Sequence, residues 1–225
     1  MDKRTYETVI SYIKSEILSG NLKQGKKLMP ERELALLLGV SRTSVREALR
    51  TLEILGLIES IQGAGNYISG NFEKSITEVL SMMFLLQQTD TRQLSLVRET
   101  LELKAAELAT VHITEPQIKE LETILSKMAL SKNEEAVAKL DKALHDTITR
   151  ASDNVILIQI LNAMSVLVDD FIKDIRHSIL QKEENHLKLQ IIHTDIVKAI
   201  QSGDVSATQK AFAAHSRIIE EHLGC

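Results

Sequence analysis

The sequence predicts a mainly α-helical protein, with three helices and a small β-hairpin at the N-terminus and then an antiparallel bundle of six or seven helices. Apolar residues recur at helical spacing through most of the 225 residues. Two stretches depart from this pattern. Residues 21–29 are polar and contain Gly25, so we expect a loop there, and residues 57–69 have short β-type runs around closely spaced glycines. Hydrophobic residues make up 44% of the chain, which is typical of a globular protein and argues against disorder.

Three helical segments are expected in the N-terminal part. Their ranges are residues 5–19, 31–38 and 41–55. Pro30 opens the second helix, where a missing N–H has no effect, and Gly39 ends it. Ser41 is a favourable N-cap residue for the third helix. The second and third helices are therefore joined by a very short turn.

A hairpin is expected directly after the third helix. Residues 57–61 and 66–69 form two β-type runs around Gly63-Ala64-Gly65. The order of helix, helix, tight turn, helix and hairpin is that of a winged helix-turn-helix.

The pattern after Gly70 is helical throughout. The expected helices cover residues 73–88, 91–111, 115–130, 133–151, 154–176, 181–202 and 204–223. Thr114 to Gln117 has the pattern of a capping box at a helix start. We therefore expect one domain over residues 1–70 and a second over residues 71–225.

The charge is divided unevenly between these two parts. Residues 1–70 carry 10 Lys and Arg against 8 Asp and Glu, a net charge of +2. Residues 71–225 carry 17 against 23, a net charge of −6. This difference favours nucleic-acid binding by the N-terminal part.

Several features that the sequence lacks indicate where in the cell the protein is expected. No apolar run is long enough to span a membrane, so we expect no membrane partner. The segment from Met1 to Tyr6 is charged and lacks the apolar stretch of a signal peptide. Cys225 is the sole cysteine, so no intrachain disulfide can form. These observations favour a cytoplasmic protein.

The N-terminal end of the third helix has the residues needed to read DNA. A major groove admits one α-helix, whose first residues reach the base edges. The side chains in this position are Ser41, Arg42, Thr43, Ser44 and Arg46. Arginine can bind guanine through two hydrogen bonds, and serine or threonine can bind phosphates or bases. Arg32 can meet the DNA backbone, and Gly63 lets the hairpin approach DNA closely. The alternative is that the arginines only form a solvated helix face.

A second group of residues has the composition of a metal site. Asp141 and His145 lie four residues apart on one expected helix and share its apolar side. His193 and His215 each lie within an apolar stripe of another helix. Three imidazoles and a carboxylate suit a divalent cation such as zinc, nickel or manganese. A single inward histidine is more often an ordinary core residue, so spacing alone leaves both interpretations open.

The N-terminal motifs resemble a known family. Leu28 to Ala35 and Gly39 to Arg50 closely resemble the DNA-binding domain of GntR-family regulators, which are bacterial transcription factors. The resemblance implies that operator DNA is contacted by Arg32, Arg42, Thr43, Ser44, Arg46 and Gly63. It also places the protein at the bacterial nucleoid when it is bound to DNA.

The C-terminal part resembles the all-helical effector domain, called FCD, of the FadR-type branch of this family. The matching pieces are Leu96-Val97-Arg98-Glu99 with Glu102, Asp141 with His145, Gly203-Asp204, and His193 and His215. The resemblance implies that the aspartate and the three histidines bind a metal ion, for which the donor chemistry favours a divalent cation, with zinc expected first and nickel or manganese next. It also implies that Arg98 pairs with an effector carboxylate. A buried arginine needs an anionic partner, and Glu102 one turn later is the alternative partner.

Together these expectations describe a metabolite-responsive repressor and not an enzyme. A homodimer would read a palindromic operator, because twofold protein symmetry matches twofold DNA symmetry. A small organic acid would bind in the C-terminal domain and change operator affinity. Two alternatives remain: a DNA-binding protein whose C-terminal half only dimerises, and a metal-dependent hydrolase built on Asp141 and the three histidines.

Overall fold

A computed structural model describes residues 5–87, 91–131, 133–166 and 183–221. The chain forms two compact units, which divide between Val79 and Leu80. This division lies inside α4 (Glu73–Gln87), whereas the boundary expected from the sequence, at residue 70, lies just before that helix. Within the described ranges, no helix combines the length and apolar character needed to cross a membrane.

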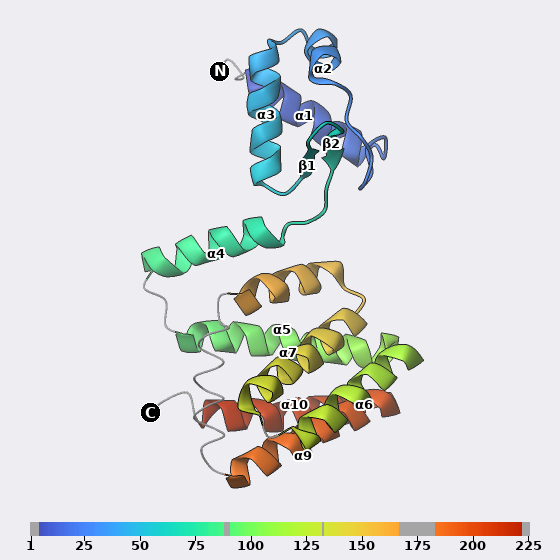
Figure 1. Cartoon of the computed structure of the whole chain (residues 1–225), viewed down its shortest axis with the longest axis vertical. Helices are drawn as coiled ribbons and strands as arrows, with labels where there is room; N and C mark the ends of the chain where they lie inside the picture. The colour runs from blue at the N-terminus through green and yellow to red at the C-terminus, as the bar shows by residue number, and fades with distance from the viewer. Residues whose placement is uncertain (1–4, 88–90, 132, 167–182, 222–225) are drawn as a thin grey trace. The chain divides into compact units, whose positions relative to one another are not determined.

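The first unit contains three helices and a two-stranded antiparallel hairpin (Figure 1). Its elements are α1 (Thr5–Leu18), α2 (Glu31–Leu38), α3 (Arg42–Ile54), β1 (Ile58–Ile61) and β2 (Gly65–Ile68). Ile58 pairs with Ile68 in the hairpin register. Gly39 ends α2 at a φ of 64°, a left-handed conformation that glycine adopts without strain. The expected winged helix-turn-helix is confirmed.

The hairpin has a further pairing that sequence analysis did not predict. The polar segment before α2 was expected to be a loop, but Lys27 forms a β-bridge with Tyr67. The backbone N–H of Leu28 donates to the Asn66 carbonyl at 2.8 Å, and that of Ile68 donates to the Lys26 carbonyl at 2.9 Å. The core of this unit contains Val9, Ile13, Leu34, Val45, Leu49, Leu52 and Ile58.

The second unit is a helical bundle. Besides the later part of α4, it contains α5 (Thr91–His112), α6 (Glu115–Leu130), α7 (Glu134–Ala151), a helix over residues 155–166, α9 (Glu183–Ser202) and α10 (Val205–Glu220). The helix expected over residues 154–176 continues, from 167 on, outside the described residues. Figure 1 shows α5, α6, α7, α9 and α10 side by side, and each of them contacts at least two of the others. The predicted mainly helical fold is confirmed.

Several hydrophobic clusters stabilise this bundle. The larger cluster includes Leu121, Met128, Leu144, Ile148, Ile196, Ile200 and Phe212, which come from α6, α7, α9 and α10. A smaller cluster contains Leu94 and Met164, against which Leu80 and Phe84 of α4 pack. The capping box at the start of α6 is present, and the Thr114 N–H donates to Gln117 Oε1 at 2.9 Å.

Candidate DNA-reading helix and candidate metal centre

The start of α3 is held by its own first residues. Ser41 has an extended backbone, and its hydroxyl oxygen accepts the N–H of Ser44 at 3.0 Å. This N-cap satisfies one of the backbone donors that the helix leaves free at its N-terminus. The other free N–H groups and the helix dipole make this end attractive to phosphate.

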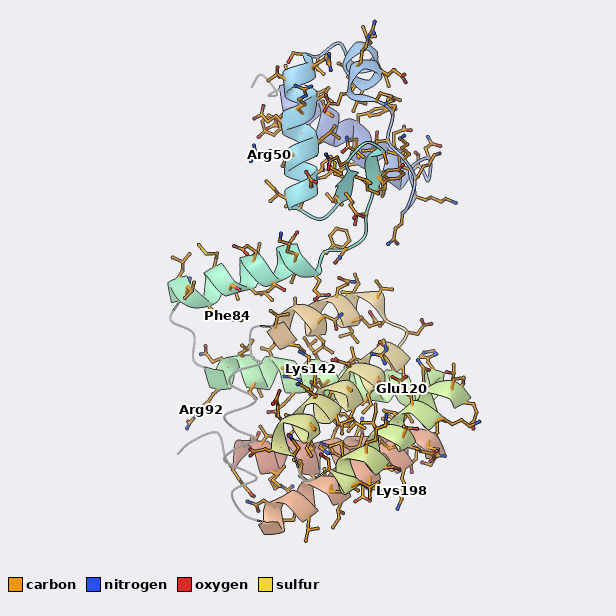
Figure 2. All side chains as sticks on the ribbon, in the orientation of Figure 1. Arg50, Phe84, Arg92, Glu120, Lys142 and Lys198 are labelled. Atoms are coloured by element: carbon orange, nitrogen blue, oxygen red, sulfur yellow. The ribbon has the colours of Figure 1, made fainter. Side chains whose placement is uncertain are left out.

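The two sides of α3 differ in exposure as the sequence predicts. Val45, Ala48, Leu49 and Leu52 are buried in the core of the first unit. Ser41 and Thr43 are exposed, and the side chains of Arg42 and Arg46 are 60% and 64% exposed. The arginines of the first turns therefore remain available to a partner. Arg50, one turn further along, projects outward from α3 (Figure 2).

Ser44 differs from these neighbours because it is buried. Its hydroxyl is hydrogen-bonded to the hydroxyl of Thr5 at 2.8 Å and to that of Ser41 at 2.9 Å. The side chain therefore connects α1 to the start of α3 and has little surface to offer DNA. The helical pattern placed Ser44 among the reading residues because it could not show that α1 lies against this position.

Arg32 and Gly63 lie in exposed positions on the other two elements of the motif. Arg32 is exposed in the first turn of α2. Gly63 lies at the tip of the hairpin with a φ of 75° and open space on its Cα. A side chain at position 63 would be strained by the backbone and would thicken the tip of the wing.

The three histidines predicted as metal ligands meet in the second unit. His145 comes from α7, His193 from α9 and His215 from α10, and all three are buried. One ligand nitrogen of each lies within 4.8 Å of the other two. When two nitrogens bind one zinc ion, each at about 2.1 Å, the distance between the nitrogens is somewhat shorter than 4.8 Å. Small rotations of the histidine side chains would therefore bring their nitrogens to binding distance.

Asp141 lies beside this cluster, one helical turn before His145. Its Oδ1 atom is 3.1 Å from Nε2 of His193, and its side chain is 14% exposed. That separation fits two donors on one cation, because each would be about 2.1 Å from the ion. The three imidazole nitrogens lie within mutual reach of one ion, and the structure places the carboxylate close to His193. Imidazoles with a carboxylate are donors that zinc, nickel and manganese accept, so the residues present fit a divalent cation.

His215 has a pKa well below its usual value. Burial is the largest cause, and the neighbouring His145 and His193 lower the pKa further. His215 is therefore neutral near pH 7 and has a nitrogen lone pair to offer. A neutral imidazole is the form that binds metal ions.

Arg98 and Glu102 form an ion pair beside the histidines. Nε of Arg98 donates to Oε1 of Glu102 at 2.7 Å, and the side chains are 14% and 11% exposed. Burial would raise the pKa of Glu102, but Arg98 and His145 outweigh it and lower that pKa, so the carboxylate is charged. Nη1 of Arg98 is buried and has no hydrogen-bond partner among the described residues.

Glu102 also connects this ion pair to the histidines, which sequence analysis missed. Its second oxygen, Oε2, lies 3.5 Å from Nδ1 of His145. The sequence showed Glu102 as a possible partner of Arg98, because the two are four residues apart on one helix. No sequence spacing relates Glu102 of α5 to His145 of α7, so only the packing of these helices shows this contact.

Known families match both units. Residues 5–68 match the family described as bacterial regulatory proteins, gntR family. Residues 93–217, more than half of the chain, match the FCD domain. The chain belongs to the GntR family of bacterial transcription regulators. The resemblance predicted from the two sets of motifs is thereby confirmed.

Similar regulators align with nearly the whole length of this GntR-family chain. The HTH-type transcriptional regulator LutR of Bacillus subtilis is 32% identical over 209 residues, which are 92% of this chain and 95% of LutR. The putative L-lactate dehydrogenase operon regulatory protein of Escherichia coli is 28% identical, over 96% of this chain and 84% of that protein. The Glc operon transcriptional activator of Escherichia coli is also 28% identical, over 96% of this chain and 88% of the activator.

A solved structure supports the fold of the GntR-family chain. The Streptococcus agalactiae GntR structure superimposes with a TM-score of 0.70 at 24% identity, over 96% of this chain and 99% of that one. Together, the family and its relatives show that the protein is a DNA-binding transcription regulator and not an enzyme. The hydrolase alternative is therefore wrong.

Proposed function

We propose that this GntR-family protein is a metabolite-responsive repressor, in which a small carboxylate bound beside a divalent metal ion changes the affinity for operator DNA. The observation that carries this proposal is the buried cluster of His145, His193 and His215. Buried titratable side chains gathered at one point favour a binding site over ordinary core packing.

The first unit supplies the DNA-binding part of the proposal. Residues 1–70 would bind the operator and residues 71–225 would bind the effector. The proposed DNA contacts are Arg32, Ser41, Arg42, Thr43, Arg46 and Gly63, with Ser44 holding the start of α3 in place. A protein that binds bacterial operators works where the chromosome lies, which places it in the cytoplasm.

The metal would be held by Asp141 and the three histidines, with zinc as the first candidate and nickel or manganese as the next. Such an ion supplies an open coordination position for an anionic oxygen. Glu102 would accept the Nδ1–H of His145, which leaves the other ring nitrogen free for the ion. Carboxylates that orient a ligand histidine in this way strengthen metal binding.

The effector would be a small organic acid. Nη1 of Arg98 is a buried donor without a partner among the described residues, and a ligand carboxylate would satisfy it. One relative is named after an L-lactate dehydrogenase operon, so L-lactate is the first acid to test. Another relative is named an activator, so the direction of the response has to be measured.

A homodimer would let two α3 helices read the two halves of a palindrome, since each chain carries a single reading helix. The second unit has an apolar surface that would suit a second copy of the chain. Met82 and Leu86 of α4 are 51% and 76% exposed, and they lie on a different side of the helix from the packed Leu80 and Phe84. Met82→Glu/Leu86→Glu is expected to shift the protein toward monomers in analytical ultracentrifugation, and an unchanged mass would reject this surface.

The first experiment is metal analysis by mass spectrometry on untagged full-length protein. We expect about one divalent ion per chain, lost in His193→Ala/His215→Ala and kept in His112→Ala, which alters an exposed histidine of α5. The metal-loaded protein should then melt at a higher temperature with L-lactate or another small carboxylate. If the protein binds neither metal nor acid, its C-terminal half serves only for dimerisation and the effector proposal is wrong.

A further inference from the structure

The first residue of α2, Glu31, lies against the arginines at the start of α3. Oε2 of Glu31 accepts a hydrogen bond from Nε of Arg46 at 2.8 Å. The same oxygen lies 4.0 Å from Nη2 of Arg42. One carboxylate therefore faces two of the cations that we propose to contact DNA, and its own side chain is only 29% exposed.

This arrangement follows from the short turn between α2 and α3. Arg42 and Arg46 are four residues apart, so they lie on one side of α3 and their like charges repel each other. The turn at Gly39 brings the first residue of α2 to that side. The carboxylate of Glu31 offsets the repulsion and gives Arg46 a preferred orientation.

The atom that Glu31 binds determines what Arg46 can still offer. Only Nε of Arg46 is hydrogen-bonded, and its Nη1 and Nη2 atoms make no hydrogen bond within the described ranges. A guanidinium held by Nε still presents its terminal amino groups as donors. Two converging donors are what a guanine edge binds through O6 and N7.

We propose that Glu31 is a specificity-determining positioning residue, which holds Arg46 in the orientation that reads guanine and reduces binding to other sequences. The inference rests on the proposed role of α3 as the reading helix. A carboxylate near the DNA surface repels phosphates, so it weakens binding to every sequence. An arginine that is already oriented loses less freedom on binding its correct base, so the correct sequence is weakened least.

The matched control residue is Glu33, which lies two positions later on the same helix. Glu33 is exposed and forms no ion pair in the part of the chain that the structure describes. Glu31→Gln and Glu33→Gln therefore remove the same charge from α2, but only the first releases Arg46. Circular dichroism of both variants checks that the fold is kept.

The experiment begins by selecting a preferred sequence with the full-length wild-type protein from a pool of random-sequence duplex DNA. The affinity of each variant for the selected duplex and for a scrambled duplex of equal length is then measured. We expect Glu31→Gln to bind the scrambled duplex more tightly than the wild-type protein does. The ratio of its affinity for the selected duplex to its affinity for the scrambled duplex should fall at least about fivefold below the wild-type ratio. Glu33→Gln should keep the wild-type ratio.

A double-mutant cycle with Arg46→Lys tests whether Glu31 affects sequence preference through Arg46. Lysine keeps the charge but cannot make the paired contact to guanine. In the Arg46→Lys background, Glu31→Gln should no longer change the ratio, because the group that Glu31 positions is absent. An equal loss in both backgrounds would overturn the inference, as would a wild-type ratio in Glu31→Gln.

Failure of the proposed DNA reading gives a different result from failure of this inference. If the wild-type protein selects no sequence, the role of α3 itself is wrong. If it selects a sequence that Glu31→Gln and Glu33→Gln bind equally well, α3 reads DNA without the help of Glu31. If Glu31→Gln does not fold, Arg46→Lys alone must lose the preference for a guanine in the selected sequence, and an unchanged preference overturns the inference.

Discussion

Arg98 and Glu102 are joined at 2.7 Å one helical turn apart on α5, and the other oxygen of Glu102 lies 3.5 Å from His145. One carboxylate thus lies between the arginine proposed to bind the effector and a histidine proposed to bind the metal. A ligand that draws Arg98 away from Glu102 would change the environment of His145. The two proposed parts of the effector site are therefore in electrostatic contact.

The first prediction concerns the stability of this ion pair. Arg98→Met should lower the free energy of unfolding by about 3–5 kcal/mol, because it leaves the Glu102 carboxylate buried without its partner. Arg98→Met/Glu102→Met should lose much less, because apolar side chains then replace both charges. Urea denaturation of the metal-free proteins measures both effects. Equal losses in the single and double variants would contradict this explanation.

The second prediction concerns the orientation of His145. Glu102→Gln should weaken metal binding by roughly 10–100-fold, because the histidine loses the carboxylate that favours its metal-binding form. Glu99→Gln is the matched control, since Glu99 accepts a hydrogen bond from Ser95 on the same helix. Competition with a coloured chelator measures the affinity. A Glu102→Gln affinity equal to that of Glu99→Gln would show that Glu102 does not orient His145.

The third prediction concerns how the stability of the protein changes at low pH through Glu107 of α5, which contacts Gln209 of α10. Hydrogen bonds from Lys104 at 2.8 Å and from Gln209 at 2.7 Å lower the pKa of Glu107. The unfolded glutamate has a pKa of about 4.3, so this contribution to stability is present above that pH and is lost as the pH falls through the folded pKa. Glu107→Gln should be less stable than wild type at neutral pH, by less than about 1 kcal/mol. Urea denaturation across the pH range should show the difference shrinking below about pH 4.3, and a constant difference would disprove the linkage.

The fourth prediction concerns two glycines of the first unit. Gly56 and Gly63 both have positive φ values, 73° and 75°, so alanine is strained at either position. A Cβ at Gly56 would also collide with the backbone carbonyl of Asn71, whereas a Cβ at Gly63 meets open space. Gly63→Ala should cost about 1 kcal/mol and Gly56→Ala clearly more, as measured by thermal denaturation. Equal melting temperatures would mean that the segment at Asn71 moves away without cost.

The helices could be predicted closely because their signals are local. The second expected helix has the observed bounds of α2, and the Ser41 cap and the capping box at Thr114 are where the sequence placed them. Each of these signals depends on residues within one or two turns of the chain. The bridge between Lys27 and Tyr67 could not be found in this way, because its partners are far apart in the sequence.

In the candidate sites, too, local patterns could be predicted from the sequence and contacts between helices could not. Helical spacing placed His145, His193 and His215 on the inner sides of three helices, because periodicity determines which side of a helix is apolar. It could not show that their nitrogens gather at one point, nor that Ser44 is buried against Thr5. Those facts depend on where the helices cross.

The sequence by itself determined the order of the elements, the winged helix-turn-helix and the family, because these depend on local pattern and on motif. The tertiary structure alone decided the pairing of Glu31 with Arg46 and the contact of Glu102 with His145. Both contacts join different helices, and their geometry depends on turns and packing that no single helix encodes. Side chains from separate helices become neighbours only when the burial of their apolar faces brings the helices together.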